Sequence, residues 1–222
     1  MLSLKFSKTI IATKKYLALP VSPHENGTHN FVSIYKGDDL LYEFFLDVCM
    51  DSPDFFVFCD IQRFGNAELT VCVEGENLDE RILAYLDPRD TYPGQNDVYR
   101  DIGRSHLHYS PVRGYASDPN GLFYYNGVYH MFYQHDPFNL SWGDWKDYVN
   151  FGWGHAVSRD LIHWEELPDV LLPDERGPVF SGTGVVDVNN VSGLRVGEHP
   201  PIILYYTAAG GQARRSRHLL HE

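Results

Sequence analysis

Residues 114–122 read Gly-Tyr-Ala-Ser-Asp-Pro-Asn-Gly-Leu, and the chain is organised around the four residues from Asp118 to Gly121. Asp, Pro, Asn and Gly each favour tight turns, through a side-chain acceptor, a fixed φ or tolerance of positive φ. Taken alone, the tetrapeptide predicts a turn that precedes an aromatic strand pair. Everything upstream then reads as a separate β unit. The surrounding residues decide whether this stretch has a chemical role.

The sequence after this stretch predicts antiparallel hairpins. Residues 122–125 and 128–134 flank Asn126-Gly127, which supplies both positive-φ positions of a two-residue hairpin turn. The same strand pattern pairs 151–158 with 161–166, and then 179–188 with 201–208. Four antiparallel strands followed by the start of another set are typical of a β-propeller, and the pattern alone also fits a sandwich.

The upstream residues alternate between apolar and polar side chains with the period of two that indicates strands. Residues 42–48 and 69–73 alternate clearly, and 55–59 form a continuous apolar run, as expected of a strand covered on both faces. Frequent turn residues between them predict a small antiparallel sandwich. Between Gly75 and His108 the pattern breaks up, which predicts a linker.

Composition limits the classes of partner. The formal net charge is −12, from 30 acidic and 18 basic residues. Nucleic acids and anionic membranes attract Lys and Arg clusters, so we expect neither as a partner and a neutral substrate instead. Aromatic residues make up 14% of the chain, which suits stacking on sugar rings and equally suits an aromatic β core. No apolar run reaches the ~18 residues of a membrane span.

Three cysteines and the two ends of the chain complete the inventory. The spacing of Cys49, Cys59 and Cys72 fits neither a disulfide framework nor a zinc site, so we expect buried free thiols and no metal. Lysines interrupt the apolar residues at the start, no signal peptide is visible, and the compartment stays open. Residues 212–222 turn basic and lose all alternation, and we expect the chain to be truncated there by a shifted reading frame or as a gene fragment.

Several stretches carry a family resemblance when taken together: the 114–122 stretch, 129–137, 141–143, 153–164 and 179–183. Their order and spacing closely resemble the opening blade of glycoside hydrolase family 32, the invertases, inulinases and levanases. Residues 15–22 resemble the accessory domain that precedes the catalytic domain in some bacterial levanases. The resemblance implies an all-β fold, with an N-terminal β-sandwich and linker at 1–105. An incomplete five-bladed β-propeller, its first blade and the start of the second, would follow at 106–211.

The resemblance also implies an activity, the retaining hydrolysis of β-fructofuranosyl linkages in sucrose, inulin or levan, with no cofactor. Asp118 matches the nucleophile. The positions that line the sugar pocket are matched by Ser117, Gln134, Trp142, Phe180 and Ser181. The family usually has Asn where Ser117 stands. Its Arg-Asp-Pro and Glu-Cys motifs have no counterpart in the chain, so we find no acid/base residue and expect the chain alone to be inactive.

Each of these residues also has a structural interpretation. Trp142 and Phe180 fit a core equally well, whereas Gln134 ends an apolar strand, where a buried polar side chain needs a reason. His155 and His163 are expected to pack on strands, and Glu165 and Glu166 to face solvent. Two other functions stay open: a non-catalytic carbohydrate-binding fragment, and a related five-bladed glycosidase acting on arabinan or xylan. Of the two enzyme classes, residues 180–182 favour a fructan hydrolase over an enzyme acting on arabinan or xylan.

Overall fold

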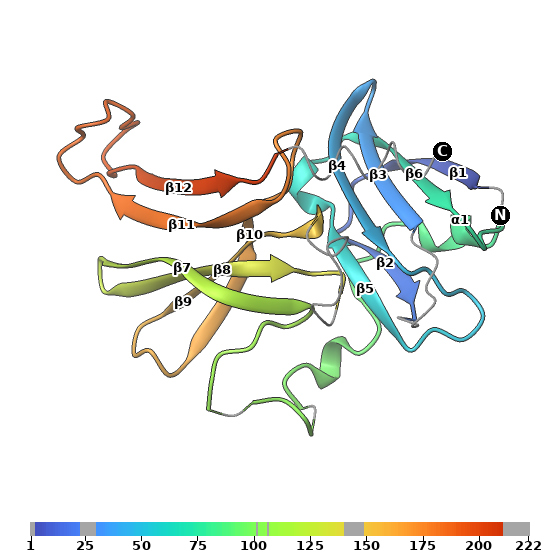
Figure 1. Ribbon diagram of the computed structural model, residues 1–222, viewed down its shortest axis with the longest axis horizontal. Coiled ribbons are helices and arrows are strands. Elements are labelled where there is room, and N and C mark those ends of the chain that lie inside the picture. The colour runs from blue at the N-terminus through green and yellow to red at the C-terminus, as the bar shows by residue number, and fades with distance from the viewer. Residues whose placement is uncertain (1–2, 23–29, 101, 106, 140–148, 211–222) are drawn as a thin grey trace.

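The computed structural model describes residues 3–22, 30–100, 102–105, 107–139 and 149–210. Trp142 and the basic tail at 212–222 lie outside these residues. Within them the protein consists mainly of antiparallel β-sheets, with a four-residue helix α1 (Ile82–Tyr85) and short 3-10 turns that include η1 (Gln62–Phe64) and η2 (Gln95–Asp97). The strands form two units that lie side by side (Figure 1). The all-β prediction is therefore confirmed.

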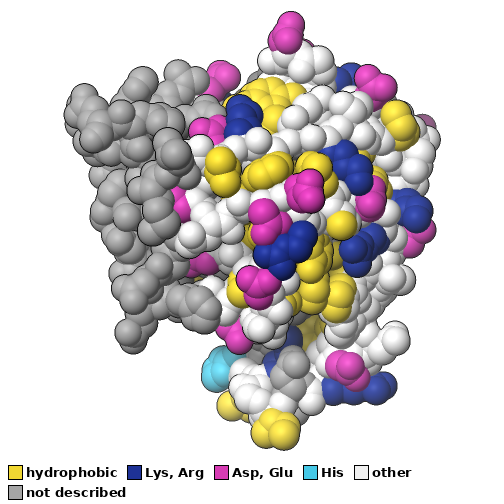
Figure 2. Space-filling view, turned by 90° about the vertical axis from the view of Figure 1, so that its right-hand side faces the viewer, with side chains coloured by type: hydrophobic (Ala, Val, Ile, Leu, Met, Phe, Trp, Pro, Cys, Tyr) yellow, Lys and Arg dark blue, Asp and Glu magenta, His cyan; other side chains and the backbone are white. Residues whose placement is uncertain are grey.

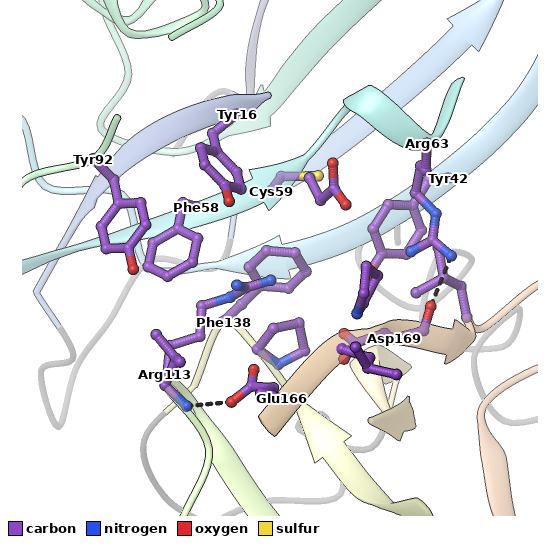
Figure 3. Close-up of a pocket in the computed structure, with 16 residues that line it drawn as sticks. Tyr16, Tyr42, Phe58, Cys59, Arg63, Tyr92, Arg113, Phe138, Glu166 and Asp169 are labelled. Atoms are coloured by element: carbon purple, nitrogen blue, oxygen red, sulfur yellow. Dashed lines mark hydrogen bonds between the residues drawn. The ribbon is translucent and has the colours of Figure 1, made fainter. Parts of the chain in front are cut away.

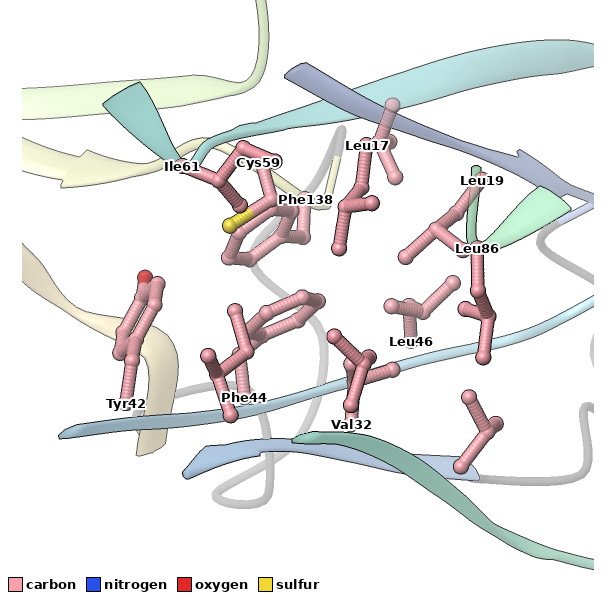
Figure 4. Packing of buried hydrophobic residues seen from close by; sticks show 14 of the residues in the cluster. Leu17, Leu19, Val32, Tyr42, Phe44, Leu46, Cys59, Ile61, Leu86 and Phe138 are labelled. Atoms are coloured by element: carbon pink, nitrogen blue, oxygen red, sulfur yellow. The ribbon is translucent and has the colours of Figure 1, made fainter. Parts of the chain in front are cut away.

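The first unit contains a four-stranded and a two-stranded antiparallel sheet. The larger sheet has the order β1-β6-β3-β4, formed by β1 (Leu4–Ile11), β6 (Glu68–Gly75), β3 (Asn30–Lys36) and β4 (Asp39–Leu46). The smaller sheet pairs β2 (Tyr16–Val21) with β5 (Phe55–Asp60). Side chains from both sheets meet in one hydrophobic core, among them Leu17, Leu19, Val32 and Phe44 (Figure 4).

The predicted alternation is confirmed in β6, and only in part in β4, where Phe45 on the opposite face is also buried. Tyr42, Phe44 and Leu46 are buried in the core, and so are all three apolar residues of β6 at 69, 71 and 73. Strand β5 buries three consecutive residues, 57–59, as predicted for a strand covered on both faces. Cys59 is buried as expected, whereas Cys49 and Cys72 are half-buried, and all three are free.

Two features of the first unit were not predicted. Strand β1 was missed because Lys5 and Lys8 interrupt it. Both pair with acidic side chains, as is common at a sheet edge. Figure 2 shows this end of the molecule, where side chains of both charge signs are interspersed. The predicted linker was also partly wrong, because Leu78, Ile82 and Leu86 from its first part are buried in the core.

The second unit begins with a four-stranded antiparallel sheet of order β10-β9-β8-β7. Its strands are β7 (Tyr115–Tyr125), β8 (Val128–Asp136), β9 (Gly152–Ser158) and β10 (Trp164–Leu171). The first hairpin is confirmed, with Asn126 at φ 49° and Gly127 at φ 81°. Strand β10 starts three residues later than predicted, because the side chains of Ser158 and Asp160 accept the backbone N–H groups of residues 161–163.

The prediction of a tight turn at Asp118-Pro119-Asn120-Gly121 was wrong. Strand β7 runs through it, with Ser117 opposite Gln134 and Pro119 opposite Tyr133 on β8. Asp118 is thus the extra residue of a β-bulge, and a second irregularity follows between residues 120 and 123. A bulged strand tolerates both the missing N–H of Pro119 and the positive φ of Gly121. These residues therefore pair with β8 as a strand, although each of them also favours a turn.

A second pair of strands, β11 (Val179–Val186) and β12 (Ile202–Ala208), forms a two-stranded sheet beside β7. β7 and β11 approach closely where each has a glycine. A Cβ built on Gly121 would lie 3.3 Å from the nitrogen of Gly184, and one on Gly184 would lie 3.2 Å from the oxygen of Gly121. Between the sheets, a small core is centred on Phe132, Trp153 and Val179.

The two units share buried contacts. Phe138, which follows β8, is buried in the core of the first unit and stacks on Phe44 with ring centroids 3.9 Å apart (Figure 4). The side-chain amide of Asn150 accepts from the backbone nitrogen of Phe45 and donates to its oxygen, each at 2.9 Å. The upstream unit is therefore packed into the second one and not merely tethered to it.

Candidate active site

The predicted site residues of β7 and β8 lie in one row across the sheet. Gln134 is the register partner of Ser117 on one side and of Trp153 on the other. Register partners project from the same face of an antiparallel sheet, so these three side chains share a face. Asp118 is the next residue along β7 and is exposed. Its position in a bulge is typical of residues whose side chains are re-aimed beside an active site.

Gln134 is the most unusual polar residue of this row. Its side chain is 4% exposed, and neither its amide oxygen nor its amide nitrogen has a hydrogen-bond partner among the described residues. Leaving a buried polar group unpaired costs about 1–3 kcal/mol. A ligand hydroxyl that donates to the oxygen or accepts from the nitrogen would recover that cost. The described residues therefore supply no structural reason for burying Gln134 at the end of an apolar strand.

Strand β11 brings a second bulge to the same place. Phe180 is opposite Thr207 and Gly182 is opposite Tyr206, so Ser181 is the extra residue, and it is exposed. The backbone oxygen of Phe180 accepts a hydrogen bond from the indole nitrogen of Trp153 at 3.3 Å. This bond holds β11 against the sheet that carries the row.

Asn120 joins the two bulges. This buried side chain donates from its amide nitrogen to the backbone oxygen of Asp118 at 2.8 Å, and its amide oxygen accepts from the nitrogen of Gly182 at 3.2 Å. The structure therefore brings the bulge of Asp118 next to the bulge of Ser181. Sequence analysis interpreted Asn120 only as a turn residue. Its place in the 118–121 motif was the available signal, but the bond to Gly182 depends on a strand about sixty residues away.

Two histidines on β8 and β9 lie on the face that carries Gln134. The ring nitrogens of His130 and His155 are 3.1 Å apart, and the ring of His155 stacks on Phe132. Burial lowers the pKa of both histidines, that of His155 to about 4, so both imidazoles are neutral at pH 7. The packing role predicted for His155 is confirmed. For His163 it was wrong, because that ring is exposed and bonded to Asp160.

The two neighbouring glutamates on β10 differ. Glu165 is exposed as predicted, but Glu166 is not: its carboxylate accepts from the backbone nitrogen of Val112, and burial raises its pKa. Glu166 pairs with Ala156 on β9, one residue away from His155, and neighbouring strand residues project to opposite faces. Glu166 therefore lies on the other face of the sheet from Gln134, packed against the first unit.

The described residues do not suggest a metal centre. No group of three or more His, Cys, Asp or Glu side chains within them is placed to hold a metal ion. Among the helices that the structure describes, none has the length and apolar character needed to span a bilayer. Among the described residues near Asp118, the side chains of Asp118, Gln134 and Ser117 offer a carboxylate, an amide and a hydroxyl group.

Comparison with known proteins places this site in a family. Residues 108–219 match the glycosyl hydrolases family 32 N-terminal domain. The levanase of Bacillus subtilis is 47% identical over 112 residues, which cover 50% of this chain and 16% of that protein.

Two solved structures are also similar. The exo-inulinase of Aspergillus awamori is 43% identical over 46% of this chain and 20% of its own, with a TM-score of 0.40. The β-fructofuranosidase of Schwanniomyces occidentalis, complexed with fructosyl-erythritol, is 30% identical over 49% of this chain and 24% of its own, with a TM-score of 0.39. The chain thus spans a quarter or less of each of these relatives. Because the matched region covers half of the sequence and includes the Asp118 and Ser181 bulges, the chain belongs to glycosyl hydrolase family 32.

Proposed function

We propose that this chain supplies the nucleophile side of a retaining glycoside hydrolase that cleaves β-fructofuranosyl linkages, as found in sucrose, inulin or levan. The proposal is supported by the family membership, by relatives named levanase and exo-inulinase, and by the row of side chains beside Asp118. The observation that carries it is the buried, unpartnered amide of Gln134 next to the exposed Asp118. The hydroxyl groups of a fructosyl unit can supply the hydrogen-bond partners that this amide does not have among the described residues.

In this proposal the second unit is the beginning of a five-bladed propeller. Strands β7 to β10 are its first blade and β11 with β12 begin the second, so that residues 106–211 belong to the catalytic domain. Residues 1–105 are an accessory β-sandwich with its linker. The four-stranded meander and the glycine contact between β7 and β11 support this assignment, because propeller blades are four-stranded antiparallel sheets that pack face to face.

Each site residue then has a role. The carboxylate of Asp118 attacks the anomeric carbon of the fructosyl unit while the bond to the leaving oxygen breaks, which gives a covalent fructosyl ester. Gln134 and Ser117 hydrogen-bond fructosyl hydroxyls, and Ser181 does the same from β11. Trp142 and Phe180 shape the pocket and exclude water. Asn120 holds the two bulges at a fixed separation.

The reaction also needs a proton donor. In retaining enzymes a second carboxyl about 5 to 5.5 Å from the nucleophile protonates the leaving oxygen. We assign no residue of this chain to that role, since Glu166 lies on the opposite face of the sheet from Gln134. General acid catalysis contributes roughly 10² to 10⁴-fold, so the 222-residue chain alone is expected to hydrolyse sucrose or fructan very slowly.

A substrate with a good leaving group tests the nucleophile without the missing acid. Incubation with β-D-fructofuranosyl fluoride should add one fructosyl unit to the chain, and mass spectrometry of the peptides should place it on Asp118. Asp118→Asn should abolish the adduct, whereas the exposed control Glu165→Gln should keep it. An adduct that persists in Asp118→Asn would refute the assignment. Rapid fructose release from sucrose, abolished by Asp118→Asn, would show that this chain contains an acid.

A further inference from the structure

A cavity of about 200 Å³ lies where the two β units meet (Figure 3). The first unit and the segment after it contribute Tyr16, Phe58 and Tyr92 to its wall. The segment before β7 and strand β10 contribute Arg113, Glu166 and Asp169. None of the described residues proposed to bind the fructosyl unit lines this cavity. It is a second hollow, built jointly by two parts of the chain that lie far apart in the sequence.

The side chain of Arg113 is held in this cavity without a hydrogen-bonding partner among the described residues. Its guanidinium lies 4.0 Å from the ring centroid of Phe58, and that ring stacks on Tyr92 with centroids 3.7 Å apart. Stacking fixes the plane of the guanidinium. The Nε atom of Arg113 is buried and unpaired, and the described residues offer its guanidinium no hydrogen bond or ion pair. A positioned set of N–H donors therefore faces the cavity.

The carboxylates of the wall are already engaged. Asp169 is bonded to the ring of His135 at 2.8 Å, Glu166 accepts from the backbone nitrogen of Val112, and Asp60 accepts from that of Gln62. Arg63, the second arginine of the wall, donates to the backbone oxygen of Asp169. None of the three carboxylates pairs with Arg113 within the described residues, and their negative charge opposes the entry of an anion. A neutral molecule with acceptor oxygens meets the unpaired donors without that repulsion.

The remaining wall suits a polyol. Figure 3 shows the hydroxyl of Tyr16 directed toward the middle of the pocket, and the rings of Phe138 and Tyr42 also belong to its wall. Aromatic rings offer apolar faces to C–H groups, while hydroxyl and guanidinium groups bind oxygens. The volume is below the roughly 300–1,000 Å³ typical of pockets for drug-sized ligands, so the occupant is small.

We propose that this cavity is a non-catalytic binding site for a neutral, polyhydroxylated molecule of about the size of a single sugar ring. Arg113 donates to its oxygens from one side, and the Tyr16 hydroxyl bonds it from the other. Because the walls come from both β units, the bound molecule bridges them. The site does not use Asp118, and it is independent of the proposed hydrolytic function.

Side-chain NMR of the 222-residue chain tests this directly. Titration with D-fructose or D-glucose should shift the Nε–H signal of Arg113 in a saturable way and leave that of the exposed Arg159 unchanged. Arg113→Gln and Tyr16→Phe should each weaken the binding about tenfold, read from the backbone amides of residues 112 and 166. Asp118→Asn should bind the sugar at the Arg113 site as the unaltered chain does.

Several results would overturn the proposal. An Arg113 signal that no neutral sugar moves would exclude the site, and a signal that only inorganic phosphate or citrate moves would make it an anion site. Sugar affinity unchanged in Tyr16→Phe, which keeps the ring and its packing, would place binding elsewhere even if Arg113→Gln failed to fold. Loss of Arg113 shifts in Asp118→Asn would show that the effect belongs to the fructosyl site.

Discussion

Replacing Phe138 by alanine removes the ring that joins the two β units. Phe138 is 3% exposed and stacks on Phe44, itself 1% exposed, at 3.9 Å and an interplanar angle of 15°. Removing a buried phenylalanine ring costs about 3–5 kcal/mol, because apolar burial is lost and a cavity remains. The stacked pair adds about 0.5–1.5 kcal/mol beyond burial. We therefore expect Phe138→Ala to lower the free energy of unfolding by about 4 kcal/mol.

The tryptophans make the assay selective. All four lie between residues 142 and 164 of the sequence, and Trp153 and Trp164 lie on strands of the second unit, whereas far-UV circular dichroism reports on the strands of both units. In urea unfolding of Phe138→Ala, both signals should shift to lower denaturant. The exposed control Tyr205→Ala should change the free energy of unfolding by no more than about 1 kcal/mol. A loss below about 1 kcal/mol for Phe138→Ala, or an unchanged tryptophan transition, would refute the shared core.

Three further predictions concern the packing around this contact and the site. Asn150→Ala should cost about 2–4 kcal/mol in urea unfolding, because it leaves the backbone nitrogen and oxygen of Phe45 unpaired, and a loss under about 1 kcal/mol would contradict this. Burial raises the pKa of Asp136 to about 6, above its usual 3.8, so the protonated form is favoured in the folded state and stability should fall as the pH rises from about 4 to 6, by up to about 3 kcal/mol. Asp136→Asn should remove that fall in stability. The unfolding free energy of the variant is subtracted from that of the unaltered chain at each pH, so that the opposite pH dependence from the lowered pKa of His155 cancels. An identical pH profile in the variant would exclude Asp136 as the source of the fall. Gly121→Ala should destabilise by at least about 1 kcal/mol in thermal unfolding, since φ is +53° and the added Cβ would lie 2.9 Å from the ring of Phe132. An unchanged melting temperature would argue against this backbone conformation and against the close contact with Phe132.

The sequence predicts the parts of this fold that depend on neighbouring residues. Asn126-Gly127 identifies its hairpin because both positive-φ positions are local, and the alternation of β6 follows from its one buried face. Strand β1 was missed because an edge strand needs only half of its residues apolar and is protected by lysines. The bulge at Asp118 was mistaken for a turn because its residues favour both structures, and only pairing with β8 distinguishes them.

The candidate site was predictable in its members and not in its connections. The family resemblance named Asp118, Ser117 and Gln134, and the structure places all three together on β7 and β8. The bond from Asn120 to Gly182 and the burial of Glu166 depend on contacts with distant segments. The alternation of residues along a strand predicts which side chains share a face of the sheet, but it does not predict which segment packs against that face.

The amide of Asn150 has one more consequence, for the solubility of the protein. Strand β4 is the outer strand of its sheet, and an outer strand exposes backbone groups to which a strand of another molecule can add. Asn150 occupies both backbone groups of Phe45, as one peptide unit of a neighbouring strand would. A single side chain thus closes the sheet edge at its most hydrophobic end, and intermolecular strand addition there would first have to break the contact between the two units.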